Sequence, residues 1–295
     1  MRVSNNSVTA RLIQQVQDSR RLLAQAQERT GSGLRINRPS DDPTGTGRVM
    51  ALKTAIEQAQ QYQRNSDLAL SDLTVTEASL SSLSDVLQRA RELAVQAANG
   101  SIGASERQQV ALEVSQLITQ ATAIGNTANG GHYIFAGQKT ATVPFVPDSA
   151  TTPTVVTYAG DTNNINREIA RGDRIAVNIT GDRVFPGIFA DLITFRDHLT
   201  ANNATAIATD ADNVGARLDQ TLELRSEVGA KMNRVETGQQ RLTDEEAMLK
   251  GLVSNEQDAD LAQSIVELQA RETTLQAALG AAGRALNLSL LDFLR

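Results

Sequence analysis

Apolar residues recur at alternating spacings of four and three near the N-terminus. The positions that follow this spacing are Leu12, Val16, Ser19, Leu23 and Ala26. Side chains at such spacings share one face of a helix, and the repeat is typical of a coiled coil. We therefore predict a helix that ends near Gly31–Gly33, where glycine allows a left-handed cap. Because it has few large apolar side chains, a helix of this length is marginal alone.

The C-terminal half carries the same repeat twice. One run continues from Val214 to Val253 without a slip, and a second occupies the last segment of the chain. The second run comprises Leu261, Ile265, Leu268, Glu272, Leu275, Leu279, Ala282 and Leu286. We expect this stripe to pair with the N-terminal stripe, and neighbouring copies of the chain to complete the packing. An ordinary bundle within one chain explains the periodicity equally well.

A long uninterrupted helix is predicted between these ends. No Pro or Gly occurs from Arg48 to Ala98, and about fifty helical residues measure roughly 75 Å. That length indicates a long bundle or coiled coil. The preceding loop reads LRINRPSDDPTGTG, in which Pro43 suits the first helical turn and Asp41 or Asp42 suits the cap.

The pattern changes at residues 129–131. Short alternating runs follow, TVVTYAG at 154–160 and RIAVNITG at 174–181, which are typical of antiparallel strands. We predict a mainly α fold with a small antiparallel β insertion (α+β), in which the N- and C-terminal regions form a long antiparallel helical bundle or coiled coil. The expected segments are an N-terminal assembly helix (1–40), a first half-rod (41–130), the β domain (131–187), a second half-rod (188–255) and a C-terminal assembly helix (256–295).

The amino-acid composition limits the classes of function that the chain can have. Only 3% of the residues are aromatic and none is Trp, which suits thin helical layers better than a compact globule. The net charge of -6 favours solubility and argues against nucleic acid as a partner. Without Cys, disulfides and thiolate metal sites are excluded. No membrane-spanning run and no cleavable signal are recognisable, which alone would indicate a cytoplasmic protein.

The sequence offers no constellation for catalysis. His132 and His198 lie far apart and lack the HExxH spacing of a zinc hydrolase. Helix capping explains the Asp pair before the long helix without a cation. The tripeptide Arg-Gly-Asp at 171–173 is explained as a hairpin turn, and Asn178 opens a formal glycosylation sequon. We predict no catalytic, cofactor or metal site.

Five blocks of sequence carry a resemblance to a known family. They are SGLRINRPSDDPTGTGRVMALK (32–53), GGHYIFAGQKT (130–140), VGAKMNRVE (228–236), DADLAQSIVELQARETTLQAAL (258–279) and LNLSLLDFL (286–294). In this order they resemble the bacterial flagellin superfamily. The Arg-Pro-Ser-Asp-Asp-Pro form at 38–43 is similar to that of the hook-associated protein 3 family, which joins the flagellar hook to the filament.

The resemblance implies a structural, non-enzymatic protein that leaves the cell without a cleaved signal, through the flagellar export apparatus and with a chaperone. This replaces the cytoplasmic interpretation. It also implies terminal helices packed among identical subunits, between hook-associated protein 1 and flagellin, without nucleic acid or membrane insertion. The expected assembly residues are Leu12, Val16, Leu23, Arg38, Pro39, Asp41, Asp42, Pro43, Leu261, Ile265, Leu268, Leu275, Leu279 and Leu286.

Two alternatives stay open at this point. A flagellin-like filament subunit would form long homopolymers, whereas a junction protein would stop at a short ring. A cytoplasmic coiled-coil adaptor, or a weak hydrolase housed in the β insertion, would not be secreted.

Overall fold

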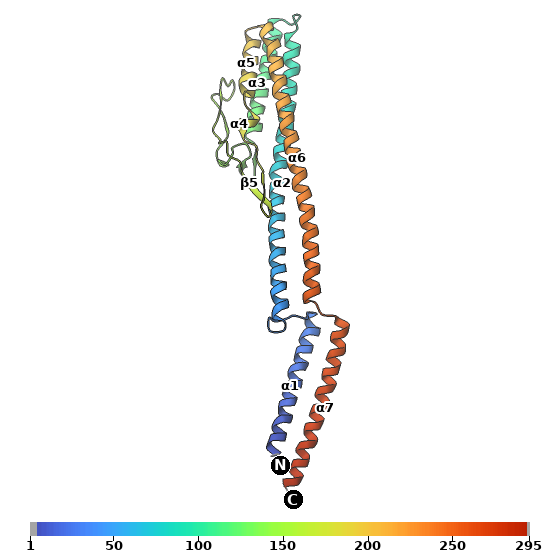
Figure 1. Ribbon diagram of the computed structural model, residues 1–295. Coiled ribbons are helices and arrows are strands. Elements are labelled where there is room, and N and C mark those ends of the chain that lie inside the picture. Colours follow the sequence, from blue (N-terminus) through green and yellow to red (C-terminus); the bar gives the residue numbers. More distant parts are fainter. Residues whose placement is uncertain (1–4, 294–295) are drawn as a thin grey trace. The chain divides into compact units, whose positions relative to one another are not determined.

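The computed structural model describes residues 5–293, and their side chains from residue 10 to residue 284 (Figure 1). The helices are α1 (Asn5–Ser32), α2 (Pro43–Ala98), α3 (Ala104–Gly125), α4 (Gly181–Val184), α5 (Ile188–Thr200), α6 (Ala204–Gln257) and α7 (Leu261–Phe293). The strands are β1 (Ala128–Asn129), β2 (His132–Tyr133), β3 (Phe145–Pro147), β4 (Val156–Tyr158), β5 (Asn166–Ala170) and β6 (Asp173–Ala176). The predicted class, mainly α with a small antiparallel insertion, is confirmed.

The chain divides into two compact units. One unit contains residues 1–58 and 245–295, and the other contains residues 59–244. The long helices α2 and α6 each contribute to both units. The five functional segments expected from the sequence remain a prediction.

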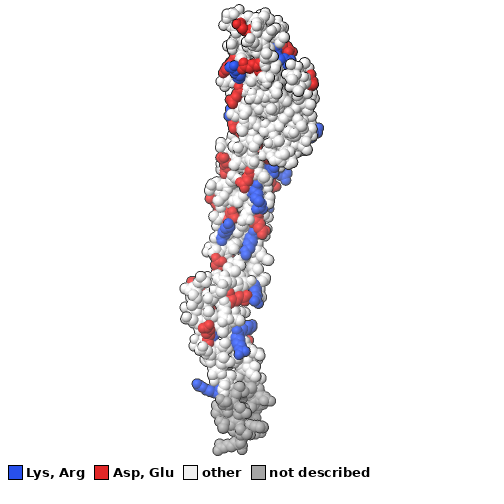
Figure 2. Space-filling view, turned by 180° about the vertical axis from the view of Figure 1, so that it is seen from behind, with Lys and Arg blue, Asp and Glu red and all other residues white. Residues whose placement is uncertain are grey.

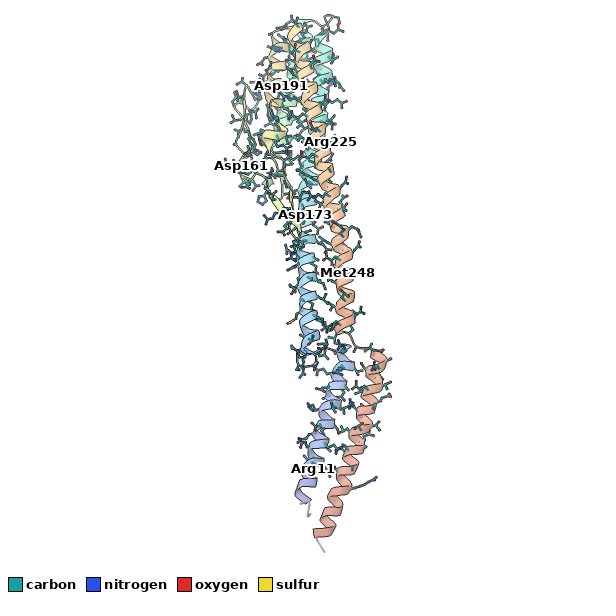
Figure 3. All side chains as sticks on the ribbon, in the orientation of Figure 1. Arg11, Asp161, Asp173, Asp191, Arg225 and Met248 are labelled. Atoms are coloured by element: carbon teal, nitrogen blue, oxygen red, sulfur yellow. The ribbon has the colours of Figure 1, made fainter. Side chains whose placement is uncertain are left out.

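In the unit 59–244, α2 and α6 pack antiparallel. Three side-chain hydrogen bonds join them: Arg225 with Glu77, Gln239 with Asp67, and Gln63 with Thr243. The residue numbers fall along α6 as they rise along α2, which defines the antiparallel direction. Figure 3 labels Arg225 on α6, whose Nη2 donates to the Glu77 carboxylate at 2.7 Å.

The core of this unit follows the heptad spacing on α2. Leu73, Leu80 and Leu87 are fully buried, and α3 adds Val114 and Ile118. Together with residues of α5 and α6 they form one continuous apolar cluster. The repeat read along α2 therefore corresponds to a covered core face.

The β insertion consists of three separate two-stranded antiparallel hairpins within the described residues, β1–β2, β3–β4 and β5–β6. Five aromatic residues join the β3–β4 hairpin to the segments that follow the insertion. The Phe145 ring lies 4.6 Å from that of Phe185 and 5.2 Å from that of Tyr158, and Phe189 stacks on Phe185. Such ring pairs stabilise beyond their buried area, so this cluster anchors the β3–β4 hairpin, which would be marginal alone.

Charges of both signs are interleaved on the face shown in Figure 2, and no large area of that face is basic alone. Within the described residues, no helix combines the length and the apolar character that crossing a bilayer requires.

Candidate assembly surface

Helices α1 and α7 lie side by side and make extensive contacts in the unit of residues 1–58 and 245–295 (Figure 1). On α1 the predicted residues Leu12, Val16, Ser19 and Leu23 are half-buried. Ala26 is the one buried residue among residues 10–32, with 5% of its surface exposed. The spacing on α1 therefore corresponds to its more covered face, which is nevertheless only partly covered.

On α7 the less exposed face is rotated from the predicted one. The half-buried residues include Ser264, Leu268, Arg271, Leu275, Ala278 and Ala282, which we call the inner stripe. Thr30 of α1 donates a hydrogen bond to the Ser264 carbonyl at 3.3 Å, which places this stripe against α1. Two of the leucines expected to face α1, Leu268 and Leu275, belong to it.

The other expected α7 residues point elsewhere. Leu261, Ile265 and Leu279 are 54%, 47% and 44% exposed, and Val266 is 66% exposed. We call these four residues the outer stripe. Ile265 and Leu279 each follow an inner-stripe residue, and successive helical residues are turned by about 100°. Leu261, Ile265 and Leu279 thus lie on a side of α7 that α1 leaves open, and Val266 lies about 100° further round the helix. The side chain of Leu286 lies outside the described residues.

The linker that follows α1 is joined to the linker that precedes α7. The Ala259 amide donates to the Gly33 carbonyl at 2.8 Å, and the Arg35 amide donates to the Gln257 carbonyl at 2.7 Å. Leu34 and Asp258 form an antiparallel bridge between these bonds. Gly33 has a φ of +70°, which suits glycine at the end of a helix. The predicted end of α1 is confirmed.

Arg35 ties this bridge to its surroundings. Its guanidinium donates to the Glu256 carbonyl at 2.6 Å and lies 3.4 Å from the Asp42 carboxylate. The Glu256 carboxylate also lies 3.6 Å from Arg48. These groups are partly exposed, so each ion pair contributes little, but together they link three segments. Sequence reasoning missed Arg35 and Glu256, because they lie 221 positions apart and belong to no periodic pattern.

The loop 38–43 is held by its two aspartates. Asp42 Oδ1 accepts from the Gly45 amide at 2.8 Å and so caps α2, whose first residue is Pro43 as expected. This backbone hydrogen bond, with a smaller contribution from Arg35, holds the pKa of Asp42 below its usual value. A Cβ at Gly45 would lie only 2.5 Å from Asp42 Oδ2, so the cap requires a small residue there.

Asp41 shapes the other half of the same loop. It accepts from the backbone amides of Asn37 and Arg38, at 3.2 and 2.9 Å. Arg38 in turn donates to both carboxylate oxygens of Glu28 on α1, and Pro39 is exposed. The carboxylates of the pair thus have backbone partners, and no cluster of three metal-ligating acids or histidines occurs in the described part of the chain.

The remaining sequence motifs have structural explanations. Asp173 of the Arg-Gly-Asp turn is hydrogen-bonded to Arg234, so its carboxylate is not free. Asn178 is 6% exposed, and both polar atoms of its amide are hydrogen-bonded within the fold. Thr180 is also buried, so the sequon Asn178–Thr180 is inaccessible in the folded chain.

Comparison with known proteins agrees with this architecture. Residues 3–140 match the bacterial flagellin N-terminal helical region, and residues 211–294 match the bacterial flagellin C-terminal helical region. These matches include α1 and α7 and leave most of the β insertion between them. The chain belongs to the bacterial flagellin family, whose members are structural proteins of the flagellum and not enzymes.

Relatives within the family include both junction and filament proteins. The chain is 27% identical to flagellar hook-associated protein 3 of Escherichia coli strain K12, over 85% of this chain and 86% of that protein. It is also 27% identical to a flagellin of Listeria innocua, over 91% of this chain and 90% of that protein. The solved structure of hook-associated protein 3 from Legionella pneumophila has a similar fold. Its TM-score is 0.65 at 17% identity, and the match covers 70% of this chain and 98% of that one.

Proposed function

We propose that this chain is the structural subunit of the junction between the flagellar hook and the filament. The observation that carries the proposal is the outer stripe of α7, whose apolar side chains are exposed in a single copy of the chain. The facing residues of α1 and α7 are themselves only half-buried. Large apolar side chains that stay exposed on one side of an otherwise paired helix are candidates for a protein contact. Family membership supports identical subunits as the partners of this face, and the resemblance at 38–43 favours the junction protein over the filament subunit.

Assembly places the chain among other flagellar components. Hook-associated protein 1 on the hook side and flagellin on the filament side are the expected neighbours. The chain reaches this extracellular site through the flagellar export apparatus, held by a chaperone beforehand and without a cleaved signal. Its contacts use the predicted residues of α1 and α7 together with the loop from Arg38 to Pro43.

A filament subunit is the second candidate function. The Listeria innocua flagellin matches at the same identity as the Escherichia coli junction protein, so identity alone does not separate the two. The two roles differ in polymer length, because a filament subunit forms long homopolymers and a junction subunit forms a short ring.

The test uses a host strain in which the gene for this chain is deleted. Electron microscopy of its flagella should show bare hooks, with flagellin shed into the medium, and the native gene should restore filaments. Restored growth of filaments made of this chain alone would instead establish the filament role. Complete filaments in the deletion strain would contradict both roles.

The same strain tests the outer stripe. Leu279→Asp adds a charge at a position that is 44% exposed in the single chain, so the free subunit should fold normally and filament attachment should fail. Leu268→Asp or Leu275→Asp, on the inner stripe, should also abolish assembly while the β insertion stays folded. Leu112→Asp is the matched control, because Leu112 is 70% exposed on α3 in the other unit. Normal attachment with Leu279→Asp would contradict the role of the outer stripe.

A further inference from the structure

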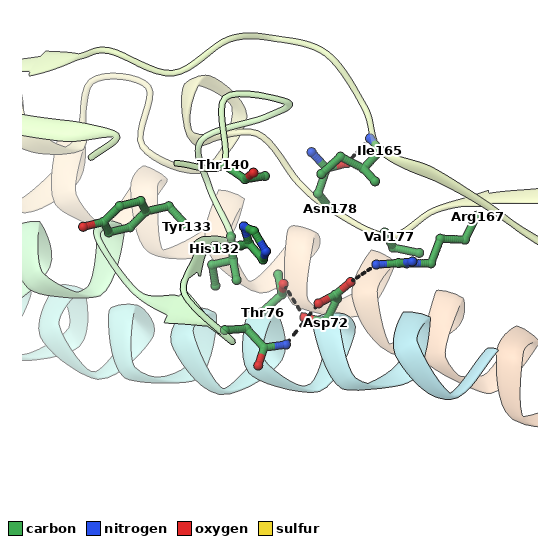
Figure 4. A pocket seen from close by; sticks show the side chains of 11 residues that line it. Asp72, Thr76, His132, Tyr133, Thr140, Ile165, Arg167, Val177 and Asn178 are labelled. Carbon is green, nitrogen blue, oxygen red and sulfur yellow. Dashed lines mark hydrogen bonds and ion pairs between the residues drawn. The ribbon is translucent and has the colours of Figure 1, made fainter. Parts of the chain in front are cut away.

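A pocket of about 230 Å³ lies between α2 and the β insertion in the unit 59–244 (Figure 4). Its polar lining includes Asp72, Thr76, Asn129, His132, Arg167 and Asn178. A pocket of this volume has room for several waters. That size fits one small ring-shaped molecule rather than a peptide or a lipid. The segments that line it lie far apart in the sequence, and neither assembly nor capping uses them.

The charges in the pocket already neutralise each other. Asp72 Oδ2 accepts from Arg167 at 3.2 Å, and Asp72 Oδ1 accepts from the Asn129 amide at 3.0 Å (Figure 4). A phosphate or carboxylate ligand would be repelled by Asp72, and a metal ion would be repelled by Arg167. A purely apolar ligand would leave these polar groups without water or partners, which is costly. The lining therefore selects a neutral, polar molecule.

Hydrogen-bonding capacity remains beside this ion pair. Each carboxylate oxygen can accept two hydrogen bonds, whereas each oxygen of Asp72 has one within the described residues. The side chain of Asp72 is 30% exposed, so a ligand can reach it. The side chain of Arg167 is 33% exposed, and of its guanidinium N–H groups only those of Nη2 have a partner among the described residues, so the guanidinium can donate further hydrogen bonds. An acceptor and a donor with spare capacity thus lie next to each other.

Two adjacent hydroxyl groups match this arrangement, since one can donate to the carboxylate while the other accepts from the guanidinium. His132, whose ring projects toward the pocket in Figure 4, adds a further polar group. Ile134, Ile165 and Val177 line the same pocket and offer an apolar surface for the C–H face of a ring. We propose that the pocket binds a neutral pyranose sugar through a vicinal diol at Asp72 and Arg167. This inference does not depend on the junction role.

The experiment uses the purified full chain and a panel of methyl glucopyranoside, methyl galactopyranoside and methyl mannopyranoside. Saturation-transfer NMR should detect at least one of them at millimolar concentration, and calorimetry should then give its Kd. Asp72→Asn preserves the shape but removes the charge, so it should weaken binding at least tenfold. Asp85→Asn, at an exposed position on the same helix, is the matched control and should leave the Kd unchanged.

A second variant tests the pocket with a substitution that is not expected to disturb folding. His132 is exposed, so His132→Ala should leave the circular dichroism spectrum unchanged while it weakens binding about threefold. The proposal is overturned if no sugar in the panel binds at millimolar concentration, or if Asp72→Asn binds it as tightly as the native chain. Binding of inorganic phosphate with similar affinity would also overturn it, because the lining would then accept an anion.

Discussion

The same heptad spacing leads to different burial in the two units of the molecule. On α2, Leu73, Leu80 and Leu87 repeat every seven residues and are fully buried. On α7, Leu268 and Leu275 repeat at the same interval but are only half-buried, and no residue from 261 to 284 is buried. The leucines of α2 belong to a cluster with residues of α3, α5 and α6, whereas the only helix with extensive contacts to α7 among the described residues is α1.

This difference shows what a periodic pattern can and cannot reveal. The spacing specifies which residues share a helix face, but the number of elements that cover the face depends on the rest of the fold. A face with one partner keeps part of its apolar surface in water, and an assembling subunit can bury that surface later. We therefore expect the α1–α7 pair to be the part of the molecule that gains most from neighbours.

Shortening a leucine side chain should reveal the largest difference in stability between the two units. Leu80→Ala opens a cavity at a residue with 0% exposure, so it should lower the free energy of unfolding by about 2–5 kcal/mol. Leu268→Ala removes the same atoms from a half-covered face and should cost the free subunit about 1 kcal/mol or less. Urea unfolding followed by circular dichroism measures both. Equal losses would show that α1 and α7 are as well packed as the core.

A pair of arginines extends the comparison to polar groups. Arg107 is 5% exposed and donates to the Ala97 and Asn99 carbonyls at the end of α2. Arg107→Met leaves these acceptors without the charged donor, so we expect a loss of about 2–3 kcal/mol. Arg35→Met removes partly exposed ion pairs at the linkers and should cost under about 1 kcal/mol in the free subunit. Thermal unfolding of both variants checks this, and a larger loss for Arg35→Met would reverse the ranking.

The fold class and the long helices could be predicted because they depend on local signals. The absence of Pro and Gly predicted α2, and Pro43 with the preceding Asp pair located its start. The hairpins were predicted only roughly, since the expected strand at 154–160 is Val156–Tyr158 in the structure. The β3–β4 hairpin depends on the contact of Phe145 and Tyr158 with Phe185 and Phe189, which lie far away in the sequence.

The candidate surface was only partly predictable for a similar reason. The α1 stripe from Leu12 to Ala26 has the expected orientation, because it offers only one apolar face. Helix α7 offers two adjacent apolar faces, and the one turned toward α1 includes the polar residues Ser264 and Arg271. A heptad count favours leucine and isoleucine over these residues. Likewise, nothing local in the sequence brings Asp72 and Arg167 together, so the pocket could not be predicted.

The smallest expected effect concerns an exposed loop of the well-covered unit. Asp148 accepts from the Thr154 side chain and from the amides of Thr154 and Val155, in the loop that connects β3 to β4. These bonds, that of the Thr154 hydroxyl first, lower the pKa of Asp148 to about 2. A lowered pKa stabilises the fold above the unfolded value of about 3.9. This contribution is lost as the pH falls from about 4 through about 2.

If the core of the unit is independent of this loop, acid should affect the hairpin alone. We expect the amide NMR signals of Thr154 and Val155 to titrate with a midpoint near pH 2, while far-UV circular dichroism stays constant over the same pH range. Asp148→Asn should abolish the titration of both amides and leave the dichroism unchanged. If the helical dichroism signal instead falls at the same pH at which these amide signals change, the hairpin and the leucine core unfold as one. Packing of the core by several elements would then make even an exposed turn unfold cooperatively with it.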